Sequence, residues 1–408
     1  MNGTSGAPNL HPIVLIDDAH TLGGAQINGL SLVIRAALRH LPQPVICICP
    51  AATRKAIREI TGDDEKLRFI DCPPALPLNI FTFPLRLWSF YKLLAPLVRG
   101  GVLICWLNLS GIEFCLAPLF ILRFLKARPV AWLHNTETFL FYSANGSAWR
   151  KLVSCVRDAV ANRWLFGLYP LIVTPSHASE NALRTRFHGG RPPRTEFLLP
   201  YVGPLNGAAG DRSEKCCSAE EKIDLWMIGR VEYAQKNSLA GLEVLRQLLT
   251  QGKDAHLTVI GDGPDLAHFR NTVEDLGLSD SVNMMGWVKD LWQSVPDSAI
   301  VLIPSFFETV CLVALEAMLN GVRMVLGPVP AFFELMPNEL IALSFSTEVF
   351  VEKVEEVSLM SCERVLVLYA EALRKFTEEA FVAKFESILQ AATAGEYQLP
   401  RSAQAGTN

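Results

Sequence analysis

Short apolar runs alternate with longer amphipathic stretches along most of the chain, and this alternation limits the fold more than any other feature. The runs are rich in Val, Ile and Leu, which is typical of strands covered on both faces. Amphipathic stretches of helical length between such strands predict parallel sheets in an α/β fold. Strands are expected at 12–18, 44–50, 101–108, 129–134 and 171–176, and again at 222–229, 255–261, 281–286, 298–304 and 323–327.

The alternation is interrupted by one polar, Gly-, Ala- and Ser-rich stretch, "LNGAAGDRSEKCCSAEEK". We interpret it as a linker between two Rossmann-like, doubly wound domains that face each other across a cleft. The expected parts are an N-terminal domain at 1–204, a linker at 205–221, a C-terminal domain at 222–350, and a C-terminal helical segment at 351–408 that packs back on the N-terminal domain and ends in a disordered tail. Ligands bind such sheets at the carboxyl ends of their strands, so the loops after the strands are the place to look for chemistry.

The composition indicates a cytoplasmic protein. Hydrophobic residues make up 50% of the 408 residues and the mean hydropathy is +0.25, yet no apolar run reaches the roughly 18 residues of a spanning helix. The first residues lack the basic and apolar regions of a signal peptide. The ten cysteines show no metal-site spacing, so we expect reduced thiols, no metal site and no essential divalent ion.

Charge is distributed unevenly between the two halves. Residues 1–200 carry a formal charge of +9 and residues 201–408 a charge of −13, so anionic partners are expected at the first half. Within it, residues 75–99 combine Phe, Trp, Tyr and Leu with Arg86, Lys92 and Arg99. This segment is predicted either to lie on a membrane surface or to pack as an internal helix. No other basic cluster carries base-stacking aromatics, which argues against a nucleic-acid partner.

Two loops in the second half carry residues suited to binding phosphate. "GRVEYAQKN" follows an expected strand and places Arg230 and Lys236 six residues apart, where a helix begins. A guanidinium binds phosphate oxygens bidentately and an ammonium adds a point charge, while a solvated surface pair is the alternative. "VIGDGPDL" places Gly261 and Gly263 directly after the next strand, where glycine permits a close backbone approach.

The stretch "SFFETVCLVALEAM" contains two acids eight residues apart, Glu308 and Glu316. On one helix they would lie roughly 80° apart and would not share a face. Glu308 is therefore expected in the loop after a strand, and Glu316 on a helix that begins near Cys311 and stops at Asn320-Gly321. An ionised acid among the leucines of that helix needs polar partners, which ribose hydroxyls could supply; two surface acids remain the alternative.

Four motifs, "GR…KN", "IGDGP", V-x-x-x-G-W-V and E-x7-E, occur here in one order. Together they resemble the C-terminal half of a GT-B glycosyltransferase of family 4, the retaining group known as glycosyl transferases group 1. The resemblance is strong over 222–330 and weaker over 12–200. It implies a GT-B fold and sugar transfer from a nucleotide-diphosphate sugar, with UDP or GDP as the nucleotide and no cofactor. The implied acceptor is a glycan or lipid-linked molecule of bacterial cell-surface polysaccharide or glycolipid synthesis, in the cytoplasm or at the cytoplasmic face of the inner membrane.

The resemblance also implies roles for single residues. Arg230 and Lys236 would neutralise the diphosphate as it leaves. Glu308 would contact the transferred sugar, and Glu316 would accept hydrogen bonds from the ribose. Further donor contacts are implied for Gly23, Gly24, Gly229, Gly261, Gly263, Trp287, Val288, Thr309, Val310, Cys311 and Leu312, with Trp287 and Val288 beside the nucleobase.

In the first half, "LGGAQ" matches the position of the family's glycine loop, with Gln26 where a charged residue is common. His134 ends a strand at the position of the family's cleft histidine. The resemblance gives it a hydrogen bond to the sugar or acceptor and leaves open whether it acts as a base.

One departure affects the donor loop: "TVCL" at 309–312 stands where the family has a glycine-containing stretch. It supports one alternative, a scaffold that binds nucleotide sugar without turnover. A second alternative is a non-hydrolysing sugar-nucleotide epimerase of the same fold. A nicotinamide dehydrogenase is disfavoured, because "LGGAQ" lacks the third glycine of GxGxxG.

Overall fold

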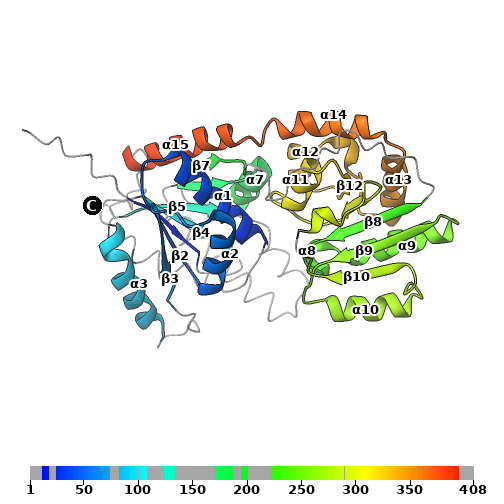
Figure 1. Ribbon diagram of the computed structural model, residues 1–408, viewed down its shortest axis with the longest axis horizontal. Coiled ribbons are helices and arrows are strands. Elements are labelled where there is room, and N and C mark those ends of the chain that lie inside the picture. Colours follow the sequence, from blue (N-terminus) through cyan, green and yellow to red (C-terminus); the bar gives the residue numbers. More distant parts are fainter. Residues whose placement is uncertain are drawn as a thin grey trace, which may run out of the picture. The chain divides into compact units, whose positions relative to one another are not determined.

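The computed structural model forms two compact units (Figure 1). Unit 1 comprises Met1–Tyr201 and Glu378–Asn408, and unit 2 comprises Val202–Thr377. The structure describes residues 12–17, 24–73, 82–98, 102–107, 121, 124–125, 127–133, 171–186, 194–200, 222–288 and 290–394. Each unit contains one parallel sheet with helices, as the alternating sequence predicts.

Unit 1 contains a seven-stranded sheet in the order β3-β2-β1-β4-β5-β6-β7, and all of its strand pairs are parallel. Its strands are β1 (Ile13–Ile16), β2 (Val45–Cys49), β3 (Leu67–Asp71), β4 (Val102–Leu107), β5 (Arg128–Leu133), β6 (Leu171–Thr174) and β7 (Arg194–Phe197). Its described helices are α1 (Gly24–His40), α2 (Ala51–Thr61), α3 (Thr82–Val98), α7 (His177–Arg186) and α15 (Glu378–Ala394). The expected strands of this half are found within two residues of their predicted bounds.

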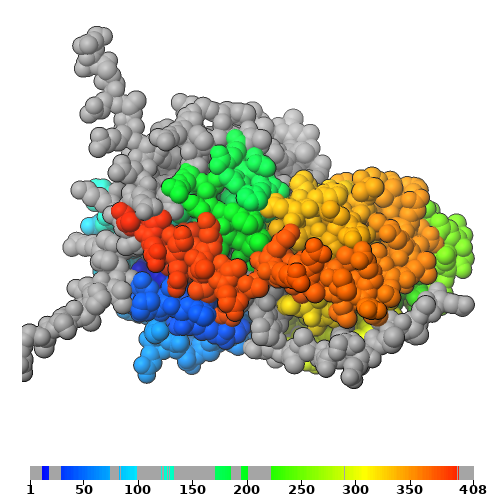
Figure 2. All heavy atoms as spheres, turned by 90° about the horizontal axis from the view of Figure 1, so that it is seen from above, coloured from blue at the N-terminus to red at the C-terminus, as the bar shows by residue number. Residues whose placement is uncertain are grey.

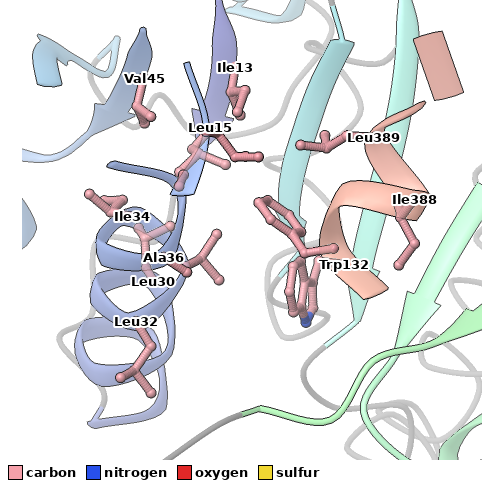
Figure 3. Packing of buried hydrophobic residues seen from close by; sticks show 14 of the residues in the cluster. Ile13, Leu15, Leu30, Leu32, Ile34, Ala36, Val45, Trp132, Ile388 and Leu389 are labelled. Carbon is pink, nitrogen blue, oxygen red and sulfur yellow. The ribbon is translucent and has the colours of Figure 1, made fainter. Parts of the chain in front are cut away.

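Apolar side chains fill both faces of this sheet. On one face Leu15 of β1, Leu30 of α1 and Trp132 of β5 belong to a single buried cluster, which Leu389 of α15 completes (Figure 3). A second cluster on the other face contains Phe90 and other residues of α3. Burial on both faces explains why the strands read as continuous apolar runs rather than as alternating ones.

The C-terminal helix α15 completes the core of unit 1. Phe381 and Phe385 pack against Trp132 with ring centroids 6.2 Å away in each case, and Lys384 Nζ donates to Glu196 Oε2 of β7 at 2.6 Å. Figure 2 shows the red α15 between the blue N-terminal segments and the green 171–200 region. The expected segment 351–408 is therefore divided, because the helices before Thr377 belong to unit 2.

Unit 2 contains a five-stranded parallel sheet in the order β10-β9-β8-β11-β12. Its strands are β8 (Ile223–Ile228), β9 (Ala255–Ile260), β10 (Val282–Gly286), β11 (Ile300–Ile303) and β12 (Arg323–Leu326). Its helices are α8 (Tyr233–Lys236), α9 (Leu239–Thr250), α10 (Leu266–Asp275), η5 (Leu291–Gln293), α11 (Leu312–Leu319), α12 (Pro330–Leu335), η6 (Asn338–Leu340), α13 (Thr347–Ser358) and α14 (Cys362–Leu373). The chain reverses direction across the sheet between β8 and β11, and such a switch point is where doubly wound sheets bind ligands.

Helix α3 has one buried face and one exposed face. The buried face fits the internal helix predicted for residues 75–99, and the exposed face leaves room for the membrane contact that was the other prediction. Phe90, Leu94 and Val98 are fully buried in unit 1. Leu85 and Trp88 lie on the opposite face and are more than half exposed. Among the described residues, no helix has the length and hydropathy needed to span a membrane.

Candidate functional site

The loop after β8 holds the first candidate residues. Gly229 is the first residue after the strand, and Arg230 follows with its side chain about half exposed. Arg230 Nη2 donates to Gln235 Oε1 at 2.8 Å and lies 2.9 Å from Glu232 Oε2. Glu232 is itself buried, so it holds the guanidinium from the protein side. The part of the guanidinium that faces solvent can still bind a ligand.

Backbone and side-chain hydrogen bonds join this loop to the loop after β11. Asn237, in a left-handed conformation with φ of 51°, donates from Nδ2 to the carbonyl oxygen of Pro304 at 3.1 Å. The amide of Phe306 donates to the carbonyl of Gln235 at 2.9 Å, and Gln235 Nε2 donates to the carbonyl of Phe307 at 3.5 Å. Because β8 and β11 are neighbours in the sheet, their loops meet although about 70 residues separate them.

The joined loops bring Lys236 and Glu308 together. Lys236 Nζ donates to Glu308 Oε1 at 2.6 Å, and Glu308 is only 8% exposed. Burial lowers the pKa of Lys236, but the adjacent Glu308 carboxylate outweighs burial and leaves that pKa raised. The ammonium therefore stays charged at neutral pH, and two of its three donors remain for another acceptor.

An open pocket lies at this switch point of unit 2. Its lining includes Arg230, Lys236, Ser305 and Cys311. Ser305 is 1% exposed, and its hydroxyl oxygen has no hydrogen-bond partner in the described part of the chain. Burial, with the nearby Glu308 carboxylate, raises the pKa of Cys311 to about 12, so this thiol stays protonated. Two cations and an unbonded buried hydroxyl suit an anionic, oxygen-rich ligand.

The glycine loop after β9 packs directly on the loop after β8. Gly261 has φ of +132°, and a Cβ built there would lie 1.9 Å from the carbonyl oxygen of Gly229. A Cβ at Gly263 would lie 2.2 Å from the carbonyl oxygen of Val231. The backbone of Val231 donates to the carbonyl of Asp262 at 3.1 Å. Both glycines of "GDG" therefore let two loops touch through their backbones, and the second Gly supports the Arg230 loop rather than facing the pocket.

The two acids of "SFFETVCLVALEAM" lie as predicted, Glu308 in the loop and Glu316 on α11, which begins at Leu312 and is capped at Asn320. Glu316 is partly buried, and Trp292 Nε1 donates to its Oε2 at 2.9 Å. Burial raises the pKa of Glu316, and the Trp292 hydrogen bond opposes that rise.

The residues of "TVCL" need no glycine. Cys311 caps α11 with φ of −87°. Positive φ among the described non-glycine residues is confined to Asn237 and Asp290. Thr309 and Val310 therefore keep ordinary backbone angles, and the missing glycine leaves no strained backbone behind it.

The segment after β10 carries the residues predicted beside the nucleobase. Trp287 is 77% exposed, and Val288 follows it. Asp290, with φ of 50°, turns the chain into η5, where its carbonyl accepts from the amide of Gln293 at 3.1 Å. This turn leads from the exposed Trp287 to Trp292, which reaches Glu316.

The candidates of the first half lie in unit 1 or outside the described residues. Gly23 and His134 fall outside them, so their predicted roles stay predictions. Gly24 is the first residue of α1, whereas "LGGAQ" was expected to form a glycine loop, and nothing is described of the Gln26 side chain.

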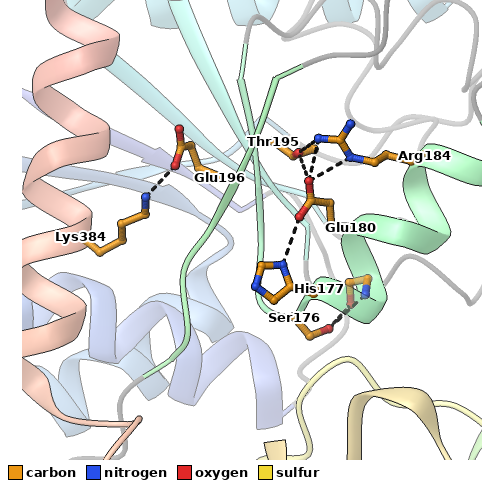
Figure 4. A network of polar contacts seen from close by, with 8 residues as sticks. Ser176, His177, Glu180, Arg184, Thr195, Glu196 and Lys384 are labelled. Atoms are coloured by element: carbon orange, nitrogen blue, oxygen red, sulfur yellow. Dashed lines mark hydrogen bonds and ion pairs between the residues drawn. The ribbon is translucent and has the colours of Figure 1, made fainter. Parts of the chain in front are cut away.

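Unit 1 has a polar network of its own after β6 (Figure 4). Glu180 accepts from Thr195 Oγ1 at 2.5 Å and from Arg184 Nε at 2.9 Å. His177 Nδ1 lies 3.3 Å from the other Glu180 oxygen, and its ring stacks on Phe197. Burial raises the pKa of Glu180, but these hydrogen bonds outweigh it and leave the pKa lowered. The network joins α7 to β7 and involves none of the predicted site residues.

Sequence reasoning missed four residues of the unit 2 site: Glu232, Gln235, Trp292 and Ser305. Glu232 and Gln235 stand inside the motif that supplied Arg230, so their spacing could have suggested them. Trp292 lies 24 residues before Glu316, and no local pattern connects the two. Among the described residues, no group of three or more His, Cys, Asp or Glu side chains could hold a metal ion.

Comparison with known proteins finds one family model that is similar to part of the chain. Residues 222–358 match the family model described as "Glycosyl transferases group 1", which spans β8 to α13 and contains the whole unit 2 site. No curated protein sequence matches the chain.

Solved structures match the chain over nearly its whole length. S. aureus TarM in complex with UDP is 10% identical with a TM-score of 0.68, and the match covers 93% of this chain and 100% of TarM. WaaG, a glycosyltransferase involved in lipopolysaccharide biosynthesis, is 15% identical with a TM-score of 0.64, over 94% of this chain and 100% of WaaG. An E. coli trehalose-6-phosphate protein bound with UDP-2-fluoro glucose is 13% identical with a TM-score of 0.65, over 93% and 99%. The chain therefore has the GT-B fold, and its residues 222–358 are similar to the model of the glycosyl transferases group 1 family.

Proposed function

We propose that the chain is a retaining glycosyltransferase of family 4 type that moves a sugar from a nucleotide-diphosphate sugar to a glycan or lipid-linked acceptor. The observation that carries the proposal is the unit 2 pocket, which Arg230 and Lys236 line together with Ser305 and its unbonded hydroxyl. The family match covers the same residues. Similar structures holding UDP and UDP-2-fluoro glucose support a uridine nucleotide, with a guanosine nucleotide as the other candidate.

In this function the two cations bind the donor diphosphate. Glu232 and Glu308 already hold Arg230 and Lys236 in place, so little conformational entropy is lost when phosphate oxygens arrive. Both cations stabilise the charge that grows on the diphosphate as the glycosidic bond breaks. Glu308, which pairs with Lys236, is proposed to contact the sugar and to stabilise positive charge at the anomeric carbon.

The proposed transfer keeps the anomeric configuration. The bond from the anomeric carbon to the diphosphate oxygen breaks, and the acceptor hydroxyl oxygen bonds to the same face of that carbon. The acceptor proton passes to the departing diphosphate oxygen, so the products are the glycosylated acceptor and a nucleoside diphosphate. This route needs no nucleophile from the protein, and His134 is proposed to hydrogen-bond the sugar or acceptor.

A lipid-linked acceptor at a membrane is supported by the exposed face of α3. Trp88 stacks on Tyr91 with centroids 5.7 Å apart, and Lys92 Nζ lies 5.1 Å from the Trp88 ring centre. Residues 75–99 contain no acid, so this face suits an anionic surface. We infer peripheral contact with the cytoplasmic face of a bacterial inner membrane, in cell-surface polysaccharide or glycolipid synthesis.

Vesicle binding tests the membrane part separately. The full chain should sediment with vesicles containing phosphatidylglycerol, and Leu85→Ala/Trp88→Ala should reduce the bound fraction several-fold. Leu359→Ala, which removes a similarly exposed leucine from unit 2, is the control and should bind as wild type does. Equal binding by all three proteins would remove α3 from the proposal.

Nucleotide binding and transfer test the enzymatic part. UDP or GDP should raise the melting midpoint of the full chain, since a ligand of the native state stabilises it by mass action. Arg230→Ala should cut sugar transfer at least about tenfold, in line with the loss of a charge-assisted contact. Arg246→Ala removes an exposed arginine from α9 and should leave transfer unchanged. Unaltered transfer by Arg230→Ala would refute the assigned site.

The same assays separate the two alternatives. Incubation with UDP-glucose or UDP-N-acetylglucosamine and no acceptor should leave the donor configuration unchanged; an epimerised donor would identify an epimerase. Tight donor binding with neither transfer nor hydrolysis over an acceptor panel would identify a scaffold. Transfer should persist in EDTA, because the proposed site uses cationic side chains in place of a metal.

A further inference from the structure

The hydrogen bond between Trp292 and Glu316 joins two segments of unit 2 that lie 24 residues apart in the sequence. Trp292 belongs to the 3₁₀ turn η5, and Glu316 lies on α11. The indole Nε1 donates to Glu316 Oε2 at 2.9 Å. An indole N–H is a donor only and carries a single hydrogen, so this contact binds one oxygen of the carboxylate and fixes its rotamer.

The other oxygen of the same carboxylate stays available. Glu316 Oε1 forms no hydrogen bond with any described residue, and it is not among their fully buried unbonded polar atoms. A carboxylate that is held through one oxygen presents the other as an acceptor in a defined direction. Such an oxygen can accept a hydrogen bond from a ligand hydroxyl.

The turn that carries Trp292 is itself well defined. Asp290 adopts a left-handed conformation, and the amides of Gln293 and Ser294 close the turn on the carbonyls of Asp290 and Leu291 at 3.1 and 2.8 Å. Trp292 is also half-buried, unlike the exposed Trp287 five residues earlier. The indole is thus attached to a closed turn, which is a requirement for a residue that orients another.

We propose that Trp292 positions Glu316 for the ribose hydroxyls of the nucleotide, and that it thereby sets the preference of the site for ribonucleotides over nucleotides without those hydroxyls. The inference rests on the proposed function, since it takes the ligand to be a nucleotide. A site built to hydrogen-bond a hydroxyl discriminates strongly against the analogue that lacks it. Trp292 touches no reacting atom in this scheme, so it is a positioning residue.

The test compares UDP and GDP with their 2′,3′-dideoxy forms by calorimetry on the full chain. Wild type should bind one ribonucleotide at least about tenfold tighter than its dideoxy form, the discrimination expected of a hydrogen bond to a charged group. Trp292→Phe removes the N–H and should weaken the ribonucleotide about five- to tenfold while leaving dideoxynucleotide affinity within about twofold. Trp292→His, which keeps a ring N–H, should retain part of the lost preference.

A matched control comes from the same unit. Trp226 Nε1 donates to Asp224 Oδ2 at 2.9 Å, so Trp226→Phe removes the same kind of bond without touching Glu316. This variant should keep the wild-type ratio of affinities. In a Glu316→Ala background, Trp292→Phe should have no further effect, because the carboxylate that the indole holds is already gone.

The outcomes separate this inference from its premise. A wild type that binds neither UDP nor GDP refutes the proposed function. A wild type that binds a ribonucleotide and its dideoxy form equally, or a Trp292→Phe variant that loses affinity for both to the same degree, overturns the role given to Trp292 and leaves the proposed function standing. If Trp292→Phe does not fold, the Trp292→His protein decides: a wild-type or partial preference supports the inference, and no preference overturns it.

Discussion

The ion pair between Lys236 and Glu308 offers a quantitative test of how the unit 2 site is held together. Lys236→Met removes the ammonium and keeps most of the chain length of the side chain. The Glu308 side chain is 7% exposed and that of Lys236 is 26% exposed. Lys236→Met therefore leaves the buried Glu308 carboxylate without its cationic partner. Glu308→Gln instead leaves the Lys236 ammonium, which can reach water.

The burial of the two partners sets the expected magnitudes. Removing one partner of a buried ion pair costs about 3–5 kcal/mol of unfolding free energy. The pocket is open to solvent, so we expect about 2–3 kcal/mol for Lys236→Met and about 1 kcal/mol for Glu308→Gln. For a unit of this size, 1 kcal/mol shifts the melting midpoint by about 2–4 °C. Lys236→Met should thus lower that midpoint by roughly 4–12 °C, and Glu308→Gln by roughly 2–4 °C.

Scanning calorimetry of the full chain measures both effects. The chain has two compact units, so the transition of unit 2 is first identified as the one that UDP or GDP moves upward. Lys253→Met is the matched control, because Lys253 pairs with Glu355 at 2.8 Å with both side chains well exposed. Such a surface pair contributes about 0–1 kcal/mol.

The pH dependence of the same variants gives an independent check. The folded pKa of Lys236 is raised, so its stabilising effect is complete below the unfolded value of about 10.4 and is lost as pH rises through the folded value. The difference between wild type and Lys236→Met should hold through neutral pH and shrink only in strong alkali. Equal losses from Lys236→Met and Lys253→Met would refute the burial argument, and equal losses from Lys236→Met and Glu308→Gln would refute the asymmetry.

Three further changes test other parts of the structure. Gly261→Ala should destabilise unit 2 by more than about 2 kcal/mol, because the new Cβ would clash with the Gly229 carbonyl and the positive φ there is unfavourable for alanine. Gly277→Ala is the control in the same melting assay and should cost only about 1 kcal/mol, because the space around Gly277 is open. Phe385→Ala should lower the unfolding free energy of unit 1 by about 3–5 kcal/mol in urea titrations, and leave the nucleotide-sensitive transition unmoved. Glu316→Gln should raise the melting midpoint of unit 2 at pH 7–8, because burial raises the pKa of Glu316 and the ionised carboxylate costs stability as pH rises through that folded pKa. The gain in melting midpoint should vanish below the unfolded pKa of about 4.3. A gain at every pH would contradict ionisation of Glu316 as its cause.

The residue pattern predicted much of the fold because both of its signals are local. A buried parallel strand must be apolar on both faces, so the sequence predicts β8, β9 and β11 from short, mostly apolar runs. Helix ends are also encoded locally, and α11 begins and stops where its flanking residues predict. The half-buried β3 and the short, mostly polar β7 lacked this signal and were missed.

The residues of the candidate site also differ in whether the sequence alone could predict them. Arg230, Lys236, Glu308 and Glu316 were all predicted from spacing and family resemblance, and their roles remain predictions. Their partners were not predicted: Lys236 meets Glu308 across 72 residues, and Trp292 meets Glu316 across 24. No periodicity connects such positions, since contact depends on which strands are neighbours.

By itself the sequence determined two parallel α/β units and the loops in which binding residues lie, because hydrophobic period and turn chemistry act over a few residues. Only the tertiary structure decided that the loops after β8 and β11 close on each other, that α15 belongs to unit 1 while α13 and α14 belong to unit 2, and that Glu316 is held by an indole. These features depend on strand order and on packing between distant segments. Their free energy comes from contacts that no short stretch of the chain contains.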